Sequence, residues 1–150
     1  MRFDMRTPAD GALTPALYDA ALDMCAWAET RGAVMAVLSE HHATADGHLP
    51  APLILASAIA ARTKVLNILA AAAVLPLYHP VRLAEDISVQ DNLSRGRVAY
   101  VFGIGHRPEE YEHIGVDPAN QALRRMPRVR PMSPFSSRSR SDSDRPPQTP

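Results

Sequence analysis

Apolar residues in this chain occur either in continuous runs or at steps of three and four. The runs cover 33–38, 98–104 and 65–74, the last interrupted by Asn67, and a weaker candidate strand covers 3–5, with Asp4 between two apolar residues. Runs of this length predict β-strands. The run at 33–38 has no polar alternation, which predicts that both of its faces are buried, as in a parallel sheet covered by helices.

Between these runs the spacing of apolar residues is helical. Thr14-Pro15 predicts the start of a first helix and Gly32 its end. Two further helices are predicted. One covers 53–61, after Pro50 and Pro52, and the other covers 80–92 and begins with Pro80. Their inward faces are expected at Leu17, Ala20, Ala21, Met24, Trp27 and Ala28 in the first helix, and at Val81, Ala84, Ile87 and Ser88 in the third.

The order of these elements predicts an α/β fold. Four predicted strands alternate with three predicted helices, which indicates βα units and a parallel sheet. A doubly wound nucleotide-binding sheet needs a Gly-rich turn after its first strand, whereas this chain has RTPADGALT there. We therefore expect the first half of a (β/α)8 TIM barrel, since a whole barrel takes about 250 residues.

Charge divides the chain into two parts. Residues 1–124 carry a net charge of −4, and we interpret them as the barrel half. Residues 125–150 carry +4, are rich in Arg, Ser and Pro, and are expected to be a disordered tail, which we interpret as frameshifted or as the product of a damaged gene.

The overall charge of zero argues against nucleic-acid binding, and no apolar run is long enough for a membrane span. The single cysteine, Cys25, excludes an internal disulfide and fits a reducing cytoplasm.

Candidate chemistry lies just after the predicted strands, at the carboxyl ends where parallel sheets bind ligands. Glu40, His41 and His42 follow the second strand. Small residues occupy 70–73 in the third strand and Gly103-Ile104-Gly105 ends the fourth, so a flat ligand could approach the backbone. Each feature also has an ordinary structural interpretation, as loop or packing residues. No metal site is expected, because the histidines lack HExxH spacing, and Glu109-Glu110 is interpreted as an acidic first turn of a helix.

Taken together, these segments resemble the bacterial-luciferase-like family of flavin-dependent oxidoreductases. The resemblance rests on LSEHH (38–42), LPLYHPVRLAEDISVQDNLSRGR (75–97) and GIGHRPEEYEHIGVD (103–117). It implies an enzyme, a monooxygenase that uses reduced FMN and oxygen on a small organic substrate, with a separate flavin reductase as a further partner. Hydride transfer with the deazaflavin F420 is the alternative within the family.

The resemblance also implies roles for individual residues. His41 matches the catalytic histidine of the family, and Glu40 is expected to orient it or to raise its pKa. The peptide bond Ala71-Ala72 matches a non-prolyl cis bond against the flavin ring. Gly103 and Gly105 match the flavin side of the fourth strand. Ile104 replaces a phosphate-binding arginine of the luciferase α subunit, and Arg107 is a candidate substitute.

The length of the chain sets a further expectation. Family members have more than 300 residues, and Pro127, Pro131 and Pro134 are incompatible with the long helix expected after residue 124. We expect a half barrel with open edges that binds flavin weakly or not at all, and whose edges favour homo-oligomers. A noncatalytic role, as the partner of a full-length homologue, is the non-enzyme alternative.

Overall fold

A parallel sheet of four strands forms the centre of the computed structural model, which describes residues 1–7 and 14–117. Its strands are β1 (Arg2–Phe3), β2 (Met35–Leu38), β3 (Asn67–Val74) and β4 (Val98–Gly103). The helices are α1 (Thr14–Glu29), α2 (Pro52–Arg62), α3 (Pro80–Ser94) and α4 (Pro108–Ile114), with a 3-10 turn, η1 (Leu75–Leu77). The predicted tail, 125–150, lies outside the described residues.

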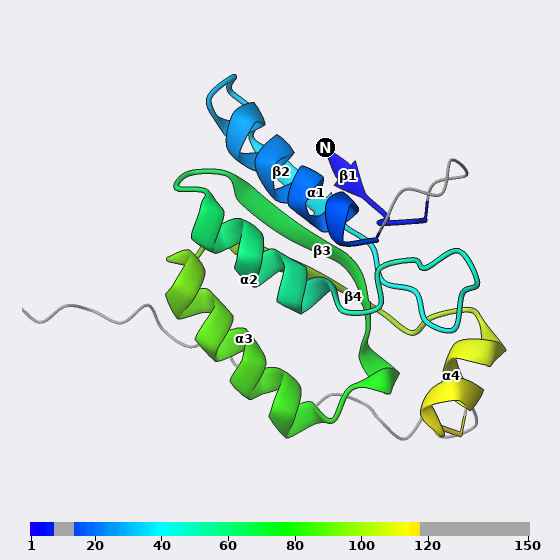
Figure 1. Cartoon of the computed structure of the whole chain (residues 1–150). Helices are drawn as coiled ribbons and strands as arrows, with labels where there is room; N and C mark the ends of the chain where they lie inside the picture. Colours follow the sequence, from blue (N-terminus) through cyan, green and yellow to red (C-terminus); the bar gives the residue numbers. More distant parts are fainter. Residues whose placement is uncertain (8–13, 118–150) are drawn as a thin grey trace, which may run out of the picture.

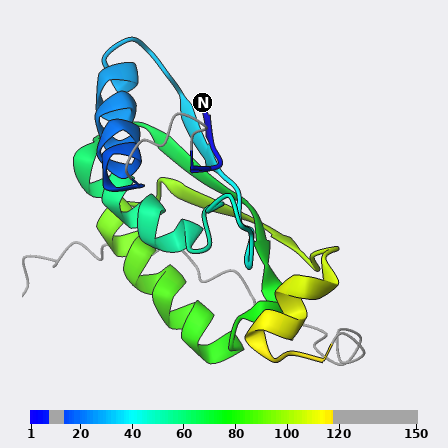
Figure 2. The same cartoon turned by 45° about the vertical axis from the view of Figure 1, so that its right-hand side comes forward.

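The strands lie side by side in sequence order, β1-β2-β3-β4, and all neighbours are parallel. Helices α1, α2 and α3 lie on one side of the sheet, while α4 lies at the ends of the strands (Figure 1; Figure 2). A doubly wound sheet reverses its strand order and carries helices on both faces. Sequential order with helices on one side is instead the arrangement of a (β/α)8 barrel wall, which confirms the predicted α/β class.

The hydrophobic core lies between the sheet and the helices. Ala36 and Leu38 of β2 are fully buried on this side, whereas Met35 is 36% exposed. Burial therefore alternates along β2. The prediction that both its faces are buried is wrong for this structure, because the helices among residues 14–117 that pack on the sheet lie on one side of it. The core consists of Phe3, Met5, Ala21, Cys25, Ala36, Leu38, Leu49, Leu55, Ala56, Ile59, Ala60, Leu66 and Ile68.

Helix α1 has the predicted start, but its buried face is shifted. Ala21, Cys25 and Ala28 are buried, while Met24 and Trp27 are 49% and 58% exposed. Apolar residues occupy more than one side of this helix, so spacing alone does not identify the side that meets the sheet. The predicted face is thus partly wrong. Burial raises the pKa of the Cys25 thiol to about 11, which keeps this side chain a neutral core residue.

Helix α3 is likewise rotated relative to the prediction. Its buried residues are Leu83, Gln90 and Ser94, and Val81 is 62% exposed. The Gln90 amide donates to the carbonyl of Leu53 and to the Ser57 hydroxyl, and its oxygen accepts from Tyr100. Burying a polar side chain with all these partners costs little free energy. The prediction from apolar residues alone therefore selected the wrong face of α3.

Two charged side chains close the amino-terminal end of the sheet. A carboxylate oxygen of Glu29 accepts the backbone N–H groups of Val65 and Leu66 at 2.6 and 2.7 Å. The Arg97 guanidinium donates to the carbonyls of Ala60 and Leu66 at 2.7 and 2.9 Å. Because these backbone donors are taken by Glu29, the β3 ladder begins at residue 67 rather than at the predicted 65.

Candidate functional site

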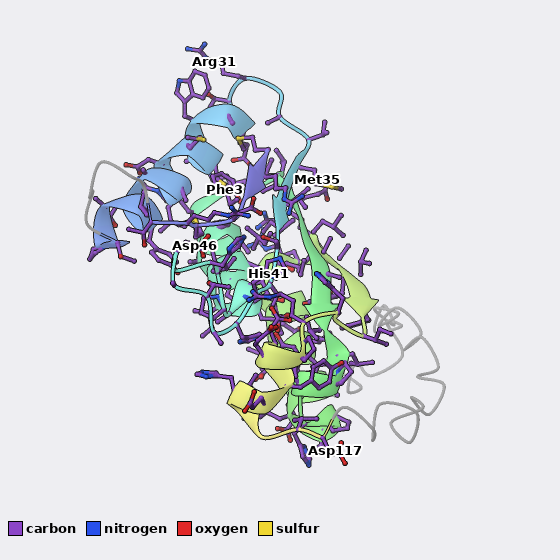
Figure 3. The ribbon with its side chains drawn as sticks, turned by 90° about the vertical axis from the view of Figure 1, so that its right-hand side faces the viewer. Phe3, Arg31, Met35, His41, Asp46 and Asp117 are labelled. Carbon is purple, nitrogen blue, oxygen red and sulfur yellow. The ribbon has the colours of Figure 1, made fainter. Side chains whose placement is uncertain are left out.

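The sequence-predicted residues, apart from Arg107, meet at the carboxyl ends of the strands, where they line a cavity of about 370 Å³. This volume lies within the range of small-molecule sites. Figure 3 shows His41 in the region where the strands end beside α4. The lining includes Ser39, Glu40, His41, Ala71, Ala72, Val74, Gly103, Gly105 and Glu110. His41 and Ala71, which lie on different strands or loops of the sequence, thus line the same cavity.

An irregularity of β3 forms one wall of this cavity. The bond Ala71-Ala72 is cis, as the family resemblance implies. Ala71 pairs with Val101 and Ala73 with Phe102, so Ala72 is an extra residue in the ladder. The normal alternation of sides is interrupted here, and two consecutive alanines face the same cavity. The result is a wall with no side-chain atom beyond Cβ.

The two glycines at the end of β4, Gly103 within the strand and Gly105 after it, pack closely against this wall. A Cβ atom on Gly103 would lie 3.2 Å from the Cβ atom of Ala72. Gly105 has a φ of +72°, and a Cβ atom there would lie 2.8 Å from a methyl carbon of Val74. Both positions thus favour glycine through contacts within the chain, while they also leave the cavity wall smooth.

His41 is held by a carboxylate from a distant element. Its Nδ1 lies 3.2 Å from Oε1 of Glu110 in α4, and the same oxygen accepts the backbone N–H of His42 at 3.1 Å. Glu110 is 1% exposed. The sequence interpretation placed this residue in a helix first turn, which is correct, but missed its contact with His41. No periodicity in a seven-residue helix distinguishes it from its neighbour Glu109.

Glu40 contacts the other histidine, so the expectation that it orients His41 is corrected. Its Oε1 lies 2.7 Å from Nε2 of His42, and its Oε2 accepts from the Val74 N–H and the Tyr78 hydroxyl at 3.1 and 2.9 Å. Burial, followed by the charge of Glu40, raises the pKa of Tyr78, which keeps its hydroxyl a donor. Glu40 therefore ties the loop after β2 to the end of β3.

A third histidine, His48, completes the surroundings of His41 and was also missed. The two rings meet edge to face, with centroids 4.7 Å apart. Nε2 of His48 accepts from the Arg6 guanidinium at 3.0 Å, which leaves Nδ1 to donate to Asp46 at 3.2 Å. The hydrogen bond from His48 lowers the pKa of Asp46. Loop residues far from a predicted strand give no sequence signal for this contact.

Arg107, the proposed phosphate ligand, lies outside the cavity lining. Its guanidinium lies 3.9 Å from a carboxylate oxygen of Glu109 and 3.8 Å from Oε1 of Glu110. Its role toward a cofactor stays a prediction.

Within 1–7 and 14–117, no cluster of three or more histidine, cysteine or acidic side chains is arranged to hold a metal ion. No helix in the same ranges has the length and apolarity to cross a bilayer.

The sequence is similar to monooxygenases. The family model described as luciferase-like monooxygenase matches residues 1–127. The oxygenase component of the flavin-dependent trigonelline monooxygenase from Acinetobacter baylyi is 31% identical over 134 residues, covering 84% of this chain and 37% of that protein. The alkanal monooxygenase alpha chain of Photorhabdus laumondii is 39% identical over 83 residues, covering 55% of this chain and 23% of that protein.

Solved structures show the same fold. The monooxygenase RslO1 from Streptomyces bottropensis superimposes with a TM-score of 0.74 at 24% identity, covering 82% of this chain and 38% of that chain. The oxygenating constituent of 3,6-diketocamphane monooxygenase from Pseudomonas putida, in complex with FMN, gives 0.71 at 22% identity, covering 82% and 35%. The chain thus spans less than two fifths of the length of each of these relatives.

Proposed function

Because the chain belongs to the luciferase-like monooxygenase family, we propose that the cavity at its strand ends is part of the active site of a flavin-dependent monooxygenase. The enzyme would use reduced FMN and oxygen on a small organic substrate. One observation carries the proposal: an acid–base side chain, His41, and a smooth backbone wall at Ala71-Ala72 line the same cavity.

The residues of this cavity fit the ring system of a flavin. Ala71, Ala72, Gly103 and Gly105 present no atoms beyond Cβ, so a flat tricyclic ring could lie against their backbone. FMN would supply the electrons with which oxygen is activated. Among the described residues of the cavity lining, Arg2 is the one arginine or lysine. We therefore assign the ring, and not the phosphate, to this part of the chain.

His41 is the residue we propose for proton transfer. An imidazole changes its protonation near neutral pH and can give or accept a proton at an oxygen atom. Its side chain is 27% exposed, whereas its partner Glu110 is 1% exposed. Buried Glu40, whose oxygens are occupied by His42, Val74 and Tyr78, would hold the loop in place without contacting His41.

A separate flavin reductase belongs to the same proposal. Two similar proteins are named as an oxygenase component and as an oxygenating constituent. Such names denote one part of a system with at least one other part. We propose that this chain's family role likewise depends on reduced flavin from another protein.

The test is a flavin titration of the purified chain. The chain contains less than two fifths of the length of its relatives, so we expect weak but saturable quenching of FMN fluorescence. Ala72→Leu should weaken this binding about tenfold or more, because a leucine side chain would occupy the space of the ring. The matched control is Ala84→Leu, at an exposed alanine of α3.

Each outcome of the titration is informative. Equal binding by both variants, or no saturable quenching by the unaltered chain, would contradict the proposal. Tighter binding of F420 than of FMN would instead support the hydride-transfer branch of the family.

A further inference from the structure

We propose that Glu110 is a positioning residue that fixes the proton of His41 on Nδ1 and leaves Nε2 as the nitrogen that exchanges a proton in the cavity. This inference rests on the proposed function, because it assigns the reacting atom of the same site. It starts from the hydrogen bonds that meet at one oxygen of Glu110.

Oxygen Oε1 of Glu110 acts as an acceptor. It lies 3.1 Å from the backbone nitrogen of His42, and a backbone N–H can only donate. It also lies 3.8 Å from a nitrogen of the Arg107 guanidinium, which has no acceptor. Because Oε1 faces these two donors, it also acts as the acceptor toward the ring of His41. Nδ1 of His41, at 3.2 Å, is therefore the N–H donor of that pair.

The other ring nitrogen of His41 is then free. In a neutral imidazole one nitrogen carries the proton and the other carries the lone pair. Nε2 has no hydrogen-bond partner among the residues that the structure describes, and His41 lines the larger cavity. With the proton held on Nδ1, Nε2 is the atom able to accept a proton from a group bound there.

His42 provides a contrast within the same loop. Its Nε2 lies 2.7 Å from Oε1 of Glu40, so this carboxylate fixes the opposite nitrogen. His42 lines a second, smaller cavity of about 190 Å³, away from Ala71 and Ala72. Two adjacent histidines are thus held in opposite tautomers by two buried carboxylates. Of these two histidines, His41 is the one that has a free Nε2 and also lines the cavity with Ala71 and Ala72.

The experiment reads the tautomer directly and needs no flavin. Long-range proton–nitrogen NMR correlation of the full chain, labelled with 15N-histidine, distinguishes protonated from unprotonated ring nitrogens. It is recorded at a pH at which imidazole is neutral, and the His41 signals are assigned by their loss in His41→Gln. For the unaltered chain we expect Nδ1–H as the main form of His41 and Nε2–H as the main form of His42.

Glu110→Gln keeps the shape of the side chain but removes its charge. An amide offers both an acceptor and a donor, so it no longer dictates the tautomer. The ratio of the Nδ1–H to the Nε2–H form of His41 should fall about fivefold, as expected when a charge-assisted hydrogen bond is replaced by a neutral one. The control Glu109→Gln alters the neighbouring, 64% exposed carboxylate and should leave the ratio unchanged.

The outcomes separate this inference from the proposed function. A main Nε2–H form of His41 in the unaltered chain overturns the inference even if Glu110→Gln does not fold. An unchanged ratio in a folded Glu110→Gln also overturns it. If the Nδ1–H form is found but FMN does not bind, the positioning role of Glu110 stands and the proposed flavin function fails.

Discussion

Glycine at position 105 combines a backbone requirement with a packing requirement. Its φ is +72°, in the left-handed region, and a Cβ atom there would meet Val74 at 2.8 Å. Gly32 has a similar φ of +82° but no atom within 4 Å of such a Cβ atom. The two positions therefore separate the cost of the conformation from the cost of the contact.

We expect Gly105→Ala to lower the free energy of unfolding by about 3 kcal/mol, from the positive φ and from overpacking against Val74. Gly32→Ala should lower it by about 1 kcal/mol, from its φ alone. Urea denaturation followed by circular dichroism measures both. If both variants lost the same free energy of unfolding, the contact with Val74 would contribute nothing, which would contradict the expected overpacking.

At the level of single residues, the sequence indicated positions but not partners. The positions of His41, Ala71, Ala72, Gly103 and Gly105 followed from the ends of strands and from the family resemblance, and the cavity contains all five. The pairing of His41 with Glu110 joins residues 69 positions apart. Such a contact depends on where α4 lies after β4, which no local pattern specifies.

Among the secondary-structure elements, α1 and β3 are joined by a single carboxylate. Glu29, the last residue of α1, accepts backbone N–H groups from Lys64, Val65 and Leu66 ahead of β3. These hydrogen bonds, the one from Val65 first, lower the pKa of Glu29. A lowered pKa means that the contribution of Glu29 to stability is present above the ordinary carboxyl pKa. It is lost as the pH falls through the lowered value.

We expect Glu29→Gln to lower the free energy of unfolding by about 1 kcal/mol at neutral pH. The difference between the unaltered chain and the variant should shrink as the pH falls below the ordinary carboxyl pKa, where Glu29 of the unfolded chain becomes protonated while Glu29 of the folded chain is still charged. Denaturation at a series of pH values measures it. Glu85→Gln, which removes an exposed carboxylate 3.7 Å from Arg82, should have little effect at any pH. A pH-independent difference for Glu29→Gln would contradict this account.

The starts of the helices were predictable, whereas their buried faces were not. Prolines lie at the start of α2, α3 and α4, where the missing N–H costs nothing. The inward side of α3 instead depends on Gln90, which is buried because Leu53, Ser57 and Tyr100 satisfy its amide. Hydrophobic spacing cannot reveal a polar residue whose partners come from other elements.

For the whole molecule, the βα alternation was sufficient to predict a parallel sheet in sequence order. Helices α1, α2 and α3 cover one side of this sheet (Figure 2). The prediction of burial on both faces of β2 failed because it assumed a sheet covered by helices, whereas α1, α2 and α3 lie on one side and burial alternates along β2. The same one-sided sheet brings the ends of β2, β3 and β4 together at the proposed flavin cavity.

The central claim, that His41 and the Ala71-Ala72 wall face one flavin ring, is tested most directly by NMR mapping of FMN on the full chain. Alanine methyl groups and histidine rings are labelled, and their shifts are followed as FMN is added. We predict that the largest changes occur at His41, Ala71 and Ala72. The core alanines Ala21 and Ala56, on the helix side of the sheet, should not change. Changes confined to other surfaces, or shifts at the alanine wall without any at His41, would contradict the account.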